Sequence, residues 1–596
     1  MRPALRAALV LLVVLMLTLC VFSTQNGSSR VPSSSSQAVS LVSQADPIQL
    51  VTNYPIPTPS SVPNAIIVGS NNHTFWFTEF GAGKIGEFDS LTANVTKEYT
   101  IGPGAMPATL AVDRHGLVWF TDQNQNSPSV WSLNTTTETF QRFSTNSSPS
   151  DPIFVLVDPT TNNVWFTDYY GNYLGEITNS THMMNKYSLP AANSYPVEIA
   201  KQNGTSYLWI TEATGRIARF DMTSHLFQEF TPTLPLSYPV GIVVDNNGNV
   251  WVSEHGGSSV TEFIPSNSTW RKYPTSQATA DPGTGVATLT MDSQERLWFA
   301  EHYSNRIGRL DPITGIMDEF ALPISGAYSL LDTVDAKGNF WFTEATANEI
   351  GMIPGNTTVA VNLRTVTAPS APVTAGQSTS GEFMVTNNNS SRITLTLNVT
   401  SFFTTSYFTT QREVSLSTYS LTLDPGQSEK VNATVTPDIS LSSGIYTAGI
   451  VATYGTISST VTFFLRVNSD PVYQLETFLP EILLAATAVV IMVFLLGLPV
   501  LRRRRPRPLR STSIPATKVA RAASLAVFFL LLVQETGQAW GKCPGLPPPP
   551  GGGPDIYGIA LDIGSITFFA VIAYLLIRSR LRERSAAGGQ EEAHSA

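Results

Sequence analysis

The sequence has few cysteines, few charged residues and few histidines. Only Cys20 and Cys543 are present among 596 residues, so no disulfide framework can hold the chain together. Charged residues make up 13%, and the 44 acidic residues outnumber the 35 basic ones, giving a net charge of -9. This acidic balance argues against nucleic acid as a partner. An aromatic content of 10% also excludes a mostly disordered chain, and the length indicates several domains.

Apolar segments near both ends predict export and membrane attachment. Residues 1–25 combine early arginines, an apolar run and a polar end, which is typical of a signal peptide or an N-terminal anchor. Residues 482–501 and 556–577 are each long enough to span a bilayer and are followed by clustered arginines. Residues 519–540 form a shorter, possible third transmembrane helix. These segments predict a protein of the cell membrane.

The arginines also predict the orientation. Basic residues favour the cytoplasmic side, so the tail at 578–596 is expected inside the cell and the large N-terminal part outside. Asn-x-Ser/Thr sequons recur from Asn26 to Asn432 and are absent beyond, which agrees with an extracellular glycoprotein. Residues 541–555 are a Pro/Gly-rich linker between the last two apolar segments. The expected partners are therefore the membrane and an unknown extracellular ligand or protein.

One short pattern recurs through the middle of the chain. Trp-Phe-Thr-Glu or a close variant begins at Trp76, Trp119, Trp165, Trp209, Trp251, Trp298 and Trp341. A period of roughly 44 residues, with short strands and no helical pattern, is typical of propeller blades of four antiparallel strands. We therefore expect an all-β fold with a seven-bladed β-propeller over residues 46–355.

Each repeat has the same internal order. In the fifth, Pro239–Asp245 predicts an inner strand, Val250–Glu254 the tryptophan strand, and Trp270–Tyr273 a half-exposed outer strand. Ahead of the first repeat, Gln49–Tyr54 resembles an outer strand. We expect it to pair with the segment around Ile350 and so complete the last blade, leaving no open edge.

These motifs resemble the streptogramin (virginiamycin B) lyase family of seven-bladed propellers. Pro-x-Gly-Ile, Asp-x-x-Gly-x-Val-Trp-Phe-Thr-Glu and Asn-x-Ile-Gly-Arg-Leu-Asp carry the similarity, the last as Asn305–Asp311. The similarity covers about residues 48–355. The resemblance implies the propeller fold. For active members it also implies opening of an ester-linked macrocycle by elimination, with Mg²⁺ and a histidine general base.

The implied reaction needs a residue that this chain does not have at the matching place. Active members carry Glu-Pro-His-Gly at the start of one inner strand. The histidine position of the seven repeats holds Asn64, Ala108, Ile153, Val197, Val240, Ala287 and Leu330. A general base must reach the proton that it removes. The sequence therefore leaves open whether the protein is an enzyme and favours a non-enzymatic one; Mg²⁺ is expected only if a carbon–oxygen lyase reaction operates.

Two Glu-His pairs are the weak candidates for catalysis. Glu254-His255 and Glu301-His302 follow the tryptophan strands of adjacent repeats. Two carboxylates and two imidazoles can hold a metal ion or move protons, with Glu254 and Glu301 as the metal candidates. Neighbouring residues on a strand point in opposite directions, however, so positions in surface loops are the simpler expectation.

An acidic residue ends the tryptophan strand of every repeat: Glu79, Asp122, Asp168, Glu212, Glu254, Glu301 and Glu344. If all faced the channel they would repel one another, unless cations such as Lys84, Arg216 and Arg306 compensated. Recurrence in every blade favours a structural role instead, in which each carboxylate accepts backbone N–H bonds from its own turn.

The repeat pattern ends before residues 357–470, where alternating strands rich in Ser and Thr take over. About 110 residues suit one β-sandwich, and the segment resembles immunoglobulin-like modules of cell surfaces. We interpret the chain as a membrane-anchored extracellular recognition or sensing module. The alternatives are a Mg-dependent lyase of the virginiamycin B lyase type and a glycosylated envelope component.

Overall fold

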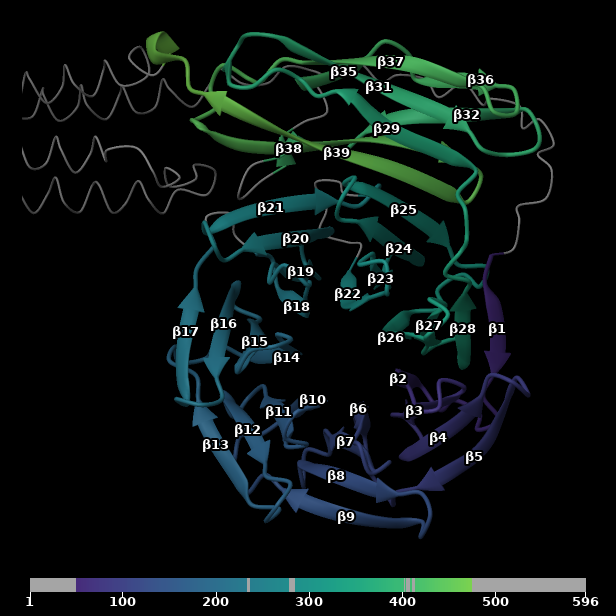
Figure 1. Ribbon diagram of the computed structural model, residues 1–596, viewed down its shortest axis with the longest axis vertical. Coiled ribbons are helices and arrows are strands. Elements are labelled where there is room, and N and C mark those ends of the chain that lie inside the picture. Colours follow the sequence, from purple (N-terminus) through teal and green to yellow (C-terminus); the bar gives the residue numbers. More distant parts are fainter. Residues whose placement is uncertain are drawn as a thin grey trace, which may run out of the picture. The chain divides into compact units, whose positions relative to one another are not determined.

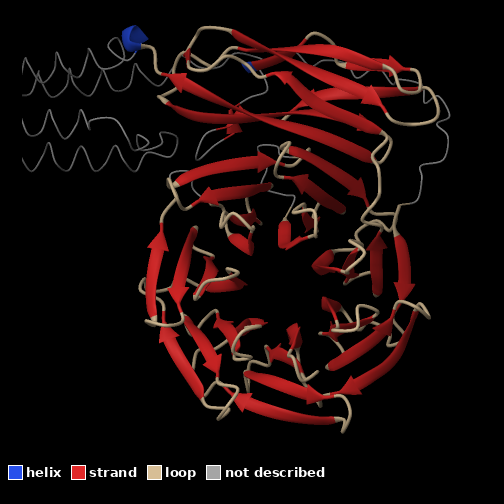
Figure 2. Cartoon of the chain, in the orientation of Figure 1, coloured by secondary structure: helices blue, strands red, loops and turns tan. Residues whose placement is uncertain are grey.

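The computed structural model of the chain describes residues 50–232, 236–277, 285–400, 402–403, 408–409 and 413–473. Strands joined by loops make up this part, with a single short helix among the described residues, as Figure 2 shows, which confirms the predicted all-β class. Within these ranges no helix is long and apolar enough to cross a bilayer. The predicted signal or anchor and the C-terminal segments lie outside the described residues: 1–25, 482–501, 519–540, 541–555, 556–577 and 578–596.

Seven four-stranded antiparallel arrays follow one another along the chain and form the propeller blades. Figure 1 shows them arranged in a ring around a common axis, with the first strand of each blade innermost. Blades 1 to 3 are β2 (Pro63–Val68), β3 (Thr74–Glu79), β4 (Lys84–Asp89), β5 (Asn94–Thr100); β6 (Pro107–Val112), β7 (Val118–Asp122), β8 (Ser129–Asn134), β9 (Thr139–Ser144); β10 (Pro152–Val157), β11 (Val164–Asp168), β12 (Tyr173–Ile177), β13 (Met184–Ser188).

The remaining blades continue the series in the same order. Blades 4 and 5 are β14 (Pro196–Lys201), β15 (Tyr207–Glu212), β16 (Arg216–Asp221), β17 (Leu226–Phe230); β18 (Pro239–Val244), β19 (Val250–Glu254), β20 (Ser259–Ile264), β21 (Thr269–Pro274). Blade 6 is β22 (Val286–Met291), β23 (Leu297–Glu301), β24 (Arg306–Asp311), β25 (Ile316–Ala321); blade 7 is β26 (Ser329–Val334), β27 (Phe340–Glu344), β28 (Glu349–Ile353) and β1 (Thr52–Pro55).

The ring closes through the N-terminal strand, as predicted. β1 pairs antiparallel with β28, with Tyr54 opposite Ile350, and supplies the outer strand of blade 7. Blade 7 also bonds to blade 1, because the hydroxyl of Thr343 donates to the carbonyl of Asn64 at 3.0 Å. The two ends of the repeat array are therefore joined both within a blade and between blades.

The recurring tryptophan locks the hairpin that precedes it. In four blades its indole N–H donates to an aspartate six residues earlier, at 2.9 to 3.2 Å. The same aspartate closes the turn: in blade 5, Asp245 Oδ1 accepts from the backbone N–H groups of Asn247 and Asn249. Gly248 in this turn has φ +81°, a conformation that glycine adopts without steric cost.

The two residues after the tryptophan also have packing roles. The phenylalanine covers a glycine of the third strand so closely that a Cβ on Gly308 would lie 2.2 Å from the ring of Phe299. The threonine hydroxyl donates to an inner-strand carbonyl of the next blade in five blades, at 2.5 to 3.1 Å: Thr78, Thr121, Thr167, Thr211 and Thr343. The Trp-Phe-Thr part of the motif is thus explained by folding alone.

Two further sheets, formed by residues 361–468, enclose a second hydrophobic core. One contains β29 (Val361–Thr367), β31 (Thr379–Asn387), β37 (Ser428–Val435) and β35 (Val414–Leu416). The other contains β39 (Ile457–Asn468), β38 (Gly444–Tyr454), β32 (Ile393–Val399) and β36 (Ser420–Leu423), with the short strands β30 (Val373–Thr374), β33 (Phe402–Phe403) and β34 (Phe408–Thr409) beside it.

This second part joins the propeller through a strand pair. β39 pairs with the outer strand of blade 6, from Ile316 opposite Val461 to Phe320 opposite Ile457. The expectation of half-exposed outer strands is therefore wrong for β25, whose central residues Met317 to Phe320 are all buried. The Ser459 hydroxyl donates to Asp318 Oδ1 at 3.1 Å, so even the polar residues of β25 are engaged.

Candidate functional site: a tyrosine and histidine rim

The two histidines of the predicted Glu-His pairs meet, and the two glutamates do not join them. His255 Nε2 and His302 Nε2 lie 2.7 Å apart, so the N–H of one ring donates a hydrogen bond to the ring nitrogen of the other. His302 is only 6% exposed, which contradicts the expectation of a surface-loop position. Burial and the neighbouring His255 lower the pKa of His302 to about 3, and burial lowers the pKa of His255 as well. Both rings are therefore neutral at pH 7.

Glu254 is fully buried and its oxygens already have partners. Its Oε1 accepts from the hydroxyls of Ser259 and Thr261. Its Oε2 accepts from the backbone N–H of Ser237 at 2.9 Å and from the ammonium of Lys272 at 2.6 Å. Lys272 neutralises this carboxylate, so Glu254 does not fit the role of a Mg²⁺ ligand.

Glu301 is also fully buried and lies beside a second acid of its own blade. Burial and the nearby Glu319 raise the pKa of Glu301 well above its usual value. The Ser304 hydroxyl donates to Glu301 Oε2 at 3.0 Å. Across the described ranges, no group of three or more His, Cys, Asp or Glu side chains is arranged to hold a metal ion. The candidate residues do not fit the Mg²⁺ that the family resemblance implies.

The seven carboxylates at the ends of the tryptophan strands lie inside their blades, each 0 to 2% exposed. Three accept backbone N–H bonds within their own blade, as expected of a structural role: Asp122 from Met106, Asp168 from Asp151, and Glu254 from Ser237. Glu79, Glu212, Glu301 and Glu344 instead face the third and fourth strands.

The charged residues of the third and fourth strands, near these carboxylates, follow one rule in six blades. Where the third strand starts with a cation, the fourth-strand residue opposite the third position of that strand is acidic. These combinations are Lys84 with Glu98, Arg216 with Glu229, and Arg306 with Glu319. Where the third strand starts with a neutral residue, the same fourth-strand position, opposite the third residue of the third strand, holds a cation. These combinations are Ser129 with Arg142, Tyr173 with Lys186, and Ser259 with Lys272. Blade 7 has Glu349 and Asn53 at these positions, and so it has no cation there.

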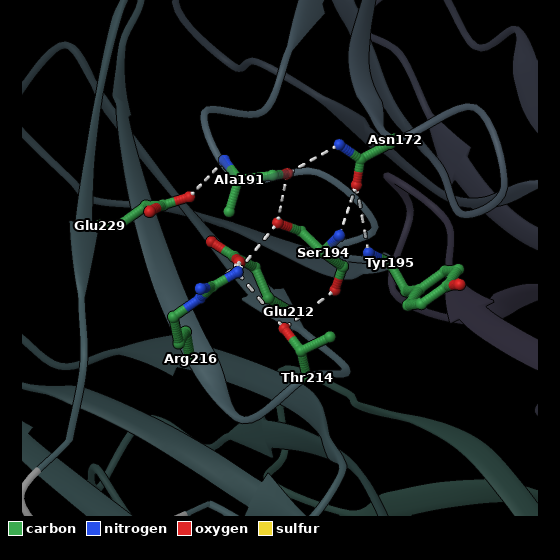
Figure 3. A network of polar contacts seen from close by, with 8 residues as sticks. All are labelled: Asn172, Ala191, Ser194, Tyr195, Glu212, Thr214, Arg216 and Glu229. Atoms are coloured by element: carbon green, nitrogen blue, oxygen red, sulfur yellow. Dashed lines mark hydrogen bonds and ion pairs between the residues drawn. The ribbon is translucent and has the colours of Figure 1, made fainter. Parts of the chain in front are cut away.

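The carboxylate of blade 4 belongs to a network that holds a loop near the channel mouth (Figure 3). Glu212 Oε2 accepts from Arg216 at 2.9 Å, and Arg216 also donates to the Ser194 hydroxyl at 3.2 Å. Asn172 Oδ1 accepts from the backbone N–H groups of Ser194 and Tyr195. Figure 3 shows these groups converging on the loop that ends at Tyr195, which directly precedes β14.

Equivalent asparagines hold the same loop elsewhere. Asn172, Asn305 and Asn348 all have positive φ, between 56° and 62°, which asparagine tolerates better than most residues. Asn305 Oδ1 accepts from the backbone N–H of Ala327, next to Tyr328. Asn348 Oδ1 accepts from the backbone N–H of Ser61. The asparagine of the Asn-x-Ile-Gly motif therefore positions the residue that precedes each next inner strand.

These loops carry a continuous set of aromatic side chains at one end of the ring, which we call the Tyr–His rim. It spans blades 3 to 7 and consists of Tyr169, Tyr170, Tyr195, Tyr238, His255, His302, Tyr303 and Tyr328. Tyr169 lies 4.9 Å from Tyr195, ring centre to ring centre, and its hydroxyl is 3.2 Å from that of Tyr238. Beyond Tyr238, His255 stands 5.6 Å away, and His302 stacks on Tyr328 at 4.6 Å.

Exposure distinguishes this rim from an ordinary hydrophobic cluster, whereas a positive φ before the inner strand also occurs at Val62 of blade 1. Tyr195, Tyr238 and Tyr328 have φ of 50° to 54°, an outlier for bulky residues that costs of order 1 kcal/mol each. Tyr170, Tyr238 and Tyr303 are 44 to 55% exposed. The sequence analysis did not predict this rim. The signal that could have indicated it is an aromatic residue beside the Pro or Glu of the repeat, as in Tyr195-Pro196 and Tyr238-Pro239.

A family model described as the virginiamycin B lyase family matches residues 34–288 and 264–408. No curated protein matches the chain. Among solved structures, selenomethionine-substituted virginiamycin B lyase from Staphylococcus aureus is 25% identical, with 51% of this chain and 98% of that chain covered and a TM-score of 0.46.

A catalytically inactive variant of that lyase, solved with quinupristin, gives the same four values. Hydrazine synthase of Kuenenia stuttgartiensis is 12% identical, with 51% and 98% of the two chains covered and a TM-score of 0.42. The family model covers more than half of the sequence. The chain therefore belongs to the virginiamycin B lyase family.

Proposed function

We propose that this chain is an exported, membrane-anchored β-propeller protein that recognises an extracellular ligand at the Tyr–His rim. The rim carries the proposal, because strained and exposed aromatic residues are gathered at one mouth of an otherwise well-packed ring. The apolar segments at 1–25 and 482–501 support export and anchoring, and the sequons support the extracellular side.

The chemistry of the rim favours a neutral ligand that has ring faces and hydroxyl groups. Tyrosine offers a flat apolar face together with a hydroxyl that donates or accepts. The histidines add no charge, because their pKa values are lowered. A sugar ring presents electropositive C–H groups to an aromatic face and hydroxyls to the phenols. We therefore propose a neutral oligosaccharide as the ligand class.

The two-sheet part at 361–468 is proposed to be an immunoglobulin-like spacer between ring and membrane. Its strand β39 is hydrogen-bonded to β25, which supports a firm connection to blade 6. It precedes the predicted span at 482–501 by few residues. In this arrangement the ring is held at a set distance from the bilayer, and the C-terminal tail is cytoplasmic.

Binding of neutral hexasaccharides to the purified full-length chain tests the recognition role. Cellohexaose, chitohexaose and mannohexaose are titrated by calorimetry against the wild type, Tyr238→Ala and Tyr303→Ala. We expect saturable binding of at least one sugar, weakened about ten-fold in each variant, or about 1.4 kcal/mol. Tyr419→Ala is the matched control, since Tyr419 is 54% exposed but lies in the two-sheet part. No binding, or equal binding by both rim variants, would refute the proposal.

Family membership favours one competing function, a Mg-dependent lyase. Quinupristin is the probe, incubated with the full-length chain with and without MgCl₂. We expect no turnover, because the inner-strand histidine is missing and Glu254 is paired with Lys272. Mg-dependent turnover that disappears in His302→Ala would replace the recognition proposal with the lyase.

A further inference from the structure

The central channel contains two acidic side chains that the packing of the blades does not require. Glu198 on β14 and Asp332 on β26 line one cavity of about 360 Å³, walled by the inner strands. They come from blades 4 and 7, which lie across the ring from one another (Figure 1). The corresponding inner-strand positions of other blades carry apolar residues, small residues or threonines, such as Ala65 and Ile66 in blade 1.

Both acids have a buried oxygen without a hydrogen-bond partner among the described residues. Glu198 is 5% exposed and its Oε2 has no partner. Asp332 Oδ1 has none either, although its Oδ2 accepts from the Thr288 hydroxyl at 3.1 Å. A buried carboxyl oxygen without a partner is costly, so such groups ordinarily face a proton donor, a cation or ordered water.

The one cationic side chain that lines the cavity does not neutralise this pair. Lys201 ends β14 and its ammonium donates to the carbonyls of Gln202 and Thr205 in the following turn. Among the described residues, the backbone N–H of Ile242 stabilises the charged form of Glu198, whereas Asp332 destabilises it. Burial raises the pKa of both acids well above their usual values. Within the described part of the chain, the pair therefore has no positively charged partner.

We propose that Glu198, Asp332 and Thr288 form a channel site for a single Ca²⁺ ion. Two carboxylates match the charge of a divalent cation, and the hydroxyl adds a third oxygen ligand. Calcium accepts six to eight oxygen ligands in a flexible arrangement, which suits groups fixed on three separate blades. The volume of the cavity leaves room for water molecules to complete the coordination. The ion would tie blades 4, 6 and 7 together across the channel.

Calcium titration of the full-length chain tests this site. Chelator-treated protein is titrated with CaCl₂ by calorimetry, and the thermal unfolding midpoint is followed through tryptophan fluorescence. We expect one ion per chain and a higher midpoint with calcium. Glu198→Gln and Asp332→Asn, which keep the shape of the side chains, should each weaken binding at least ten-fold and abolish the rise in midpoint. Native-like tryptophan fluorescence confirms that each variant is folded.

Glu262→Gln is the matched control, because Glu262 is also 5% exposed but bonds to Arg271 and Tyr273 away from the channel. It should bind calcium like the wild type. Absence of binding in the wild type would overturn the proposal. Unchanged binding in both channel variants would also overturn it, because the calcium would then be an adventitious ion only. The outcome is independent of sugar binding at the rim, since neither acid belongs to it.

Discussion

Replacing Asn53 with lysine should stabilise the closure of the ring. Asn53 lies opposite Gly351 in blade 7, the place that Lys186 and Lys272 occupy in blades 3 and 5. Its amide donates to Glu344 and, at 2.8 Å, to Glu349 Oε2. A lysine there would face two carboxylates that now share a single neutral donor.

The cost that lysine would relieve follows from the pKa of Glu344. Burial, with the charge of Glu349 next in size, raises this pKa from 4.5 to about 7. Because the pKa of Glu344 is higher in the folded chain than in the unfolded chain, burying this carboxyl costs no folding free energy below about pH 4.5, where it is protonated in both states. Stability is lost as the pH rises through 7, because the buried carboxyl then becomes charged. Above pH 7 the full shift corresponds to about 3 kcal/mol. We expect Asn53→Lys to recover about 1 to 3 kcal/mol at pH 8 and little at pH 4.5.

Chemical unfolding of the full-length chain at both pH values measures this difference. Tryptophan fluorescence follows the ring, because seven of the ten tryptophans occupy the repeated position. Glu344→Gln should also stabilise the ring at pH 8, and Asn53→Lys should add nothing to it. Asn362→Lys, an exposed change in β29, controls for the effect of reducing the net charge of -9. Equal effects of Asn53→Lys at pH 4.5 and 8, or destabilisation at pH 8, would refute the reasoning.

Three further substitutions test other parts of the ring by the same unfolding assay. Gly308→Ala should destabilise by about 1 to 3 kcal/mol, because its Cβ would overlap Phe299; an unchanged midpoint would show that the ring can move aside. Thr343→Val should cost about 1 kcal/mol through loss of the bond to Asn64, and no change would mean that this bond does not help to close the ring. His302 has a folded pKa of about 3, so the wild type should lose about 2 kcal/mol between pH 6.5 and 5. His302→Phe should remove that loss, and an equally steep pH dependence in the variant would contradict the lowered pKa.

The parts of the fold that repeat could be predicted from the sequence. The tryptophan spacing predicted the blades, since the tryptophan recurs once in each blade at the same strand position and in four blades bonds to the aspartate of its own hairpin, as Trp251 does to Asp245. The closing strand was predictable because an unpaired edge beside Ile350 needed a partner. The pairing of β25 with β39 was not, because strand partners from different domains leave no periodic signal.

The site was harder to predict because its residues do not repeat evenly. The Glu254-His255 and Glu301-His302 pairs look alike in sequence, yet Glu254 faces Lys272 and Glu301 faces Glu319. That difference arises from the fourth strand, which sequence reasoning had treated as a solvent-exposed edge. The rim escaped notice because its tyrosines come from both ends of different strands and meet only when the ring is closed.

The residues of the repeated motif and the residues for which we propose a function occupy different positions in the ring. Tryptophan, phenylalanine, threonine and the strand-ending acid are all engaged in holding the blades, so they leave little chemistry for a ligand. Differences between blades are therefore where function must be sought. They gather in two places: the rim around Tyr238 and the channel acids Glu198 and Asp332. In blade 4, the position that aligns with the histidine of Glu-Pro-His-Gly is Val197, which lies between Tyr195 and Glu198. The proposed recognition surface would therefore differ from a catalytic mouth of this family by a few residues at the start of the inner strands, on blades that pack in the same way.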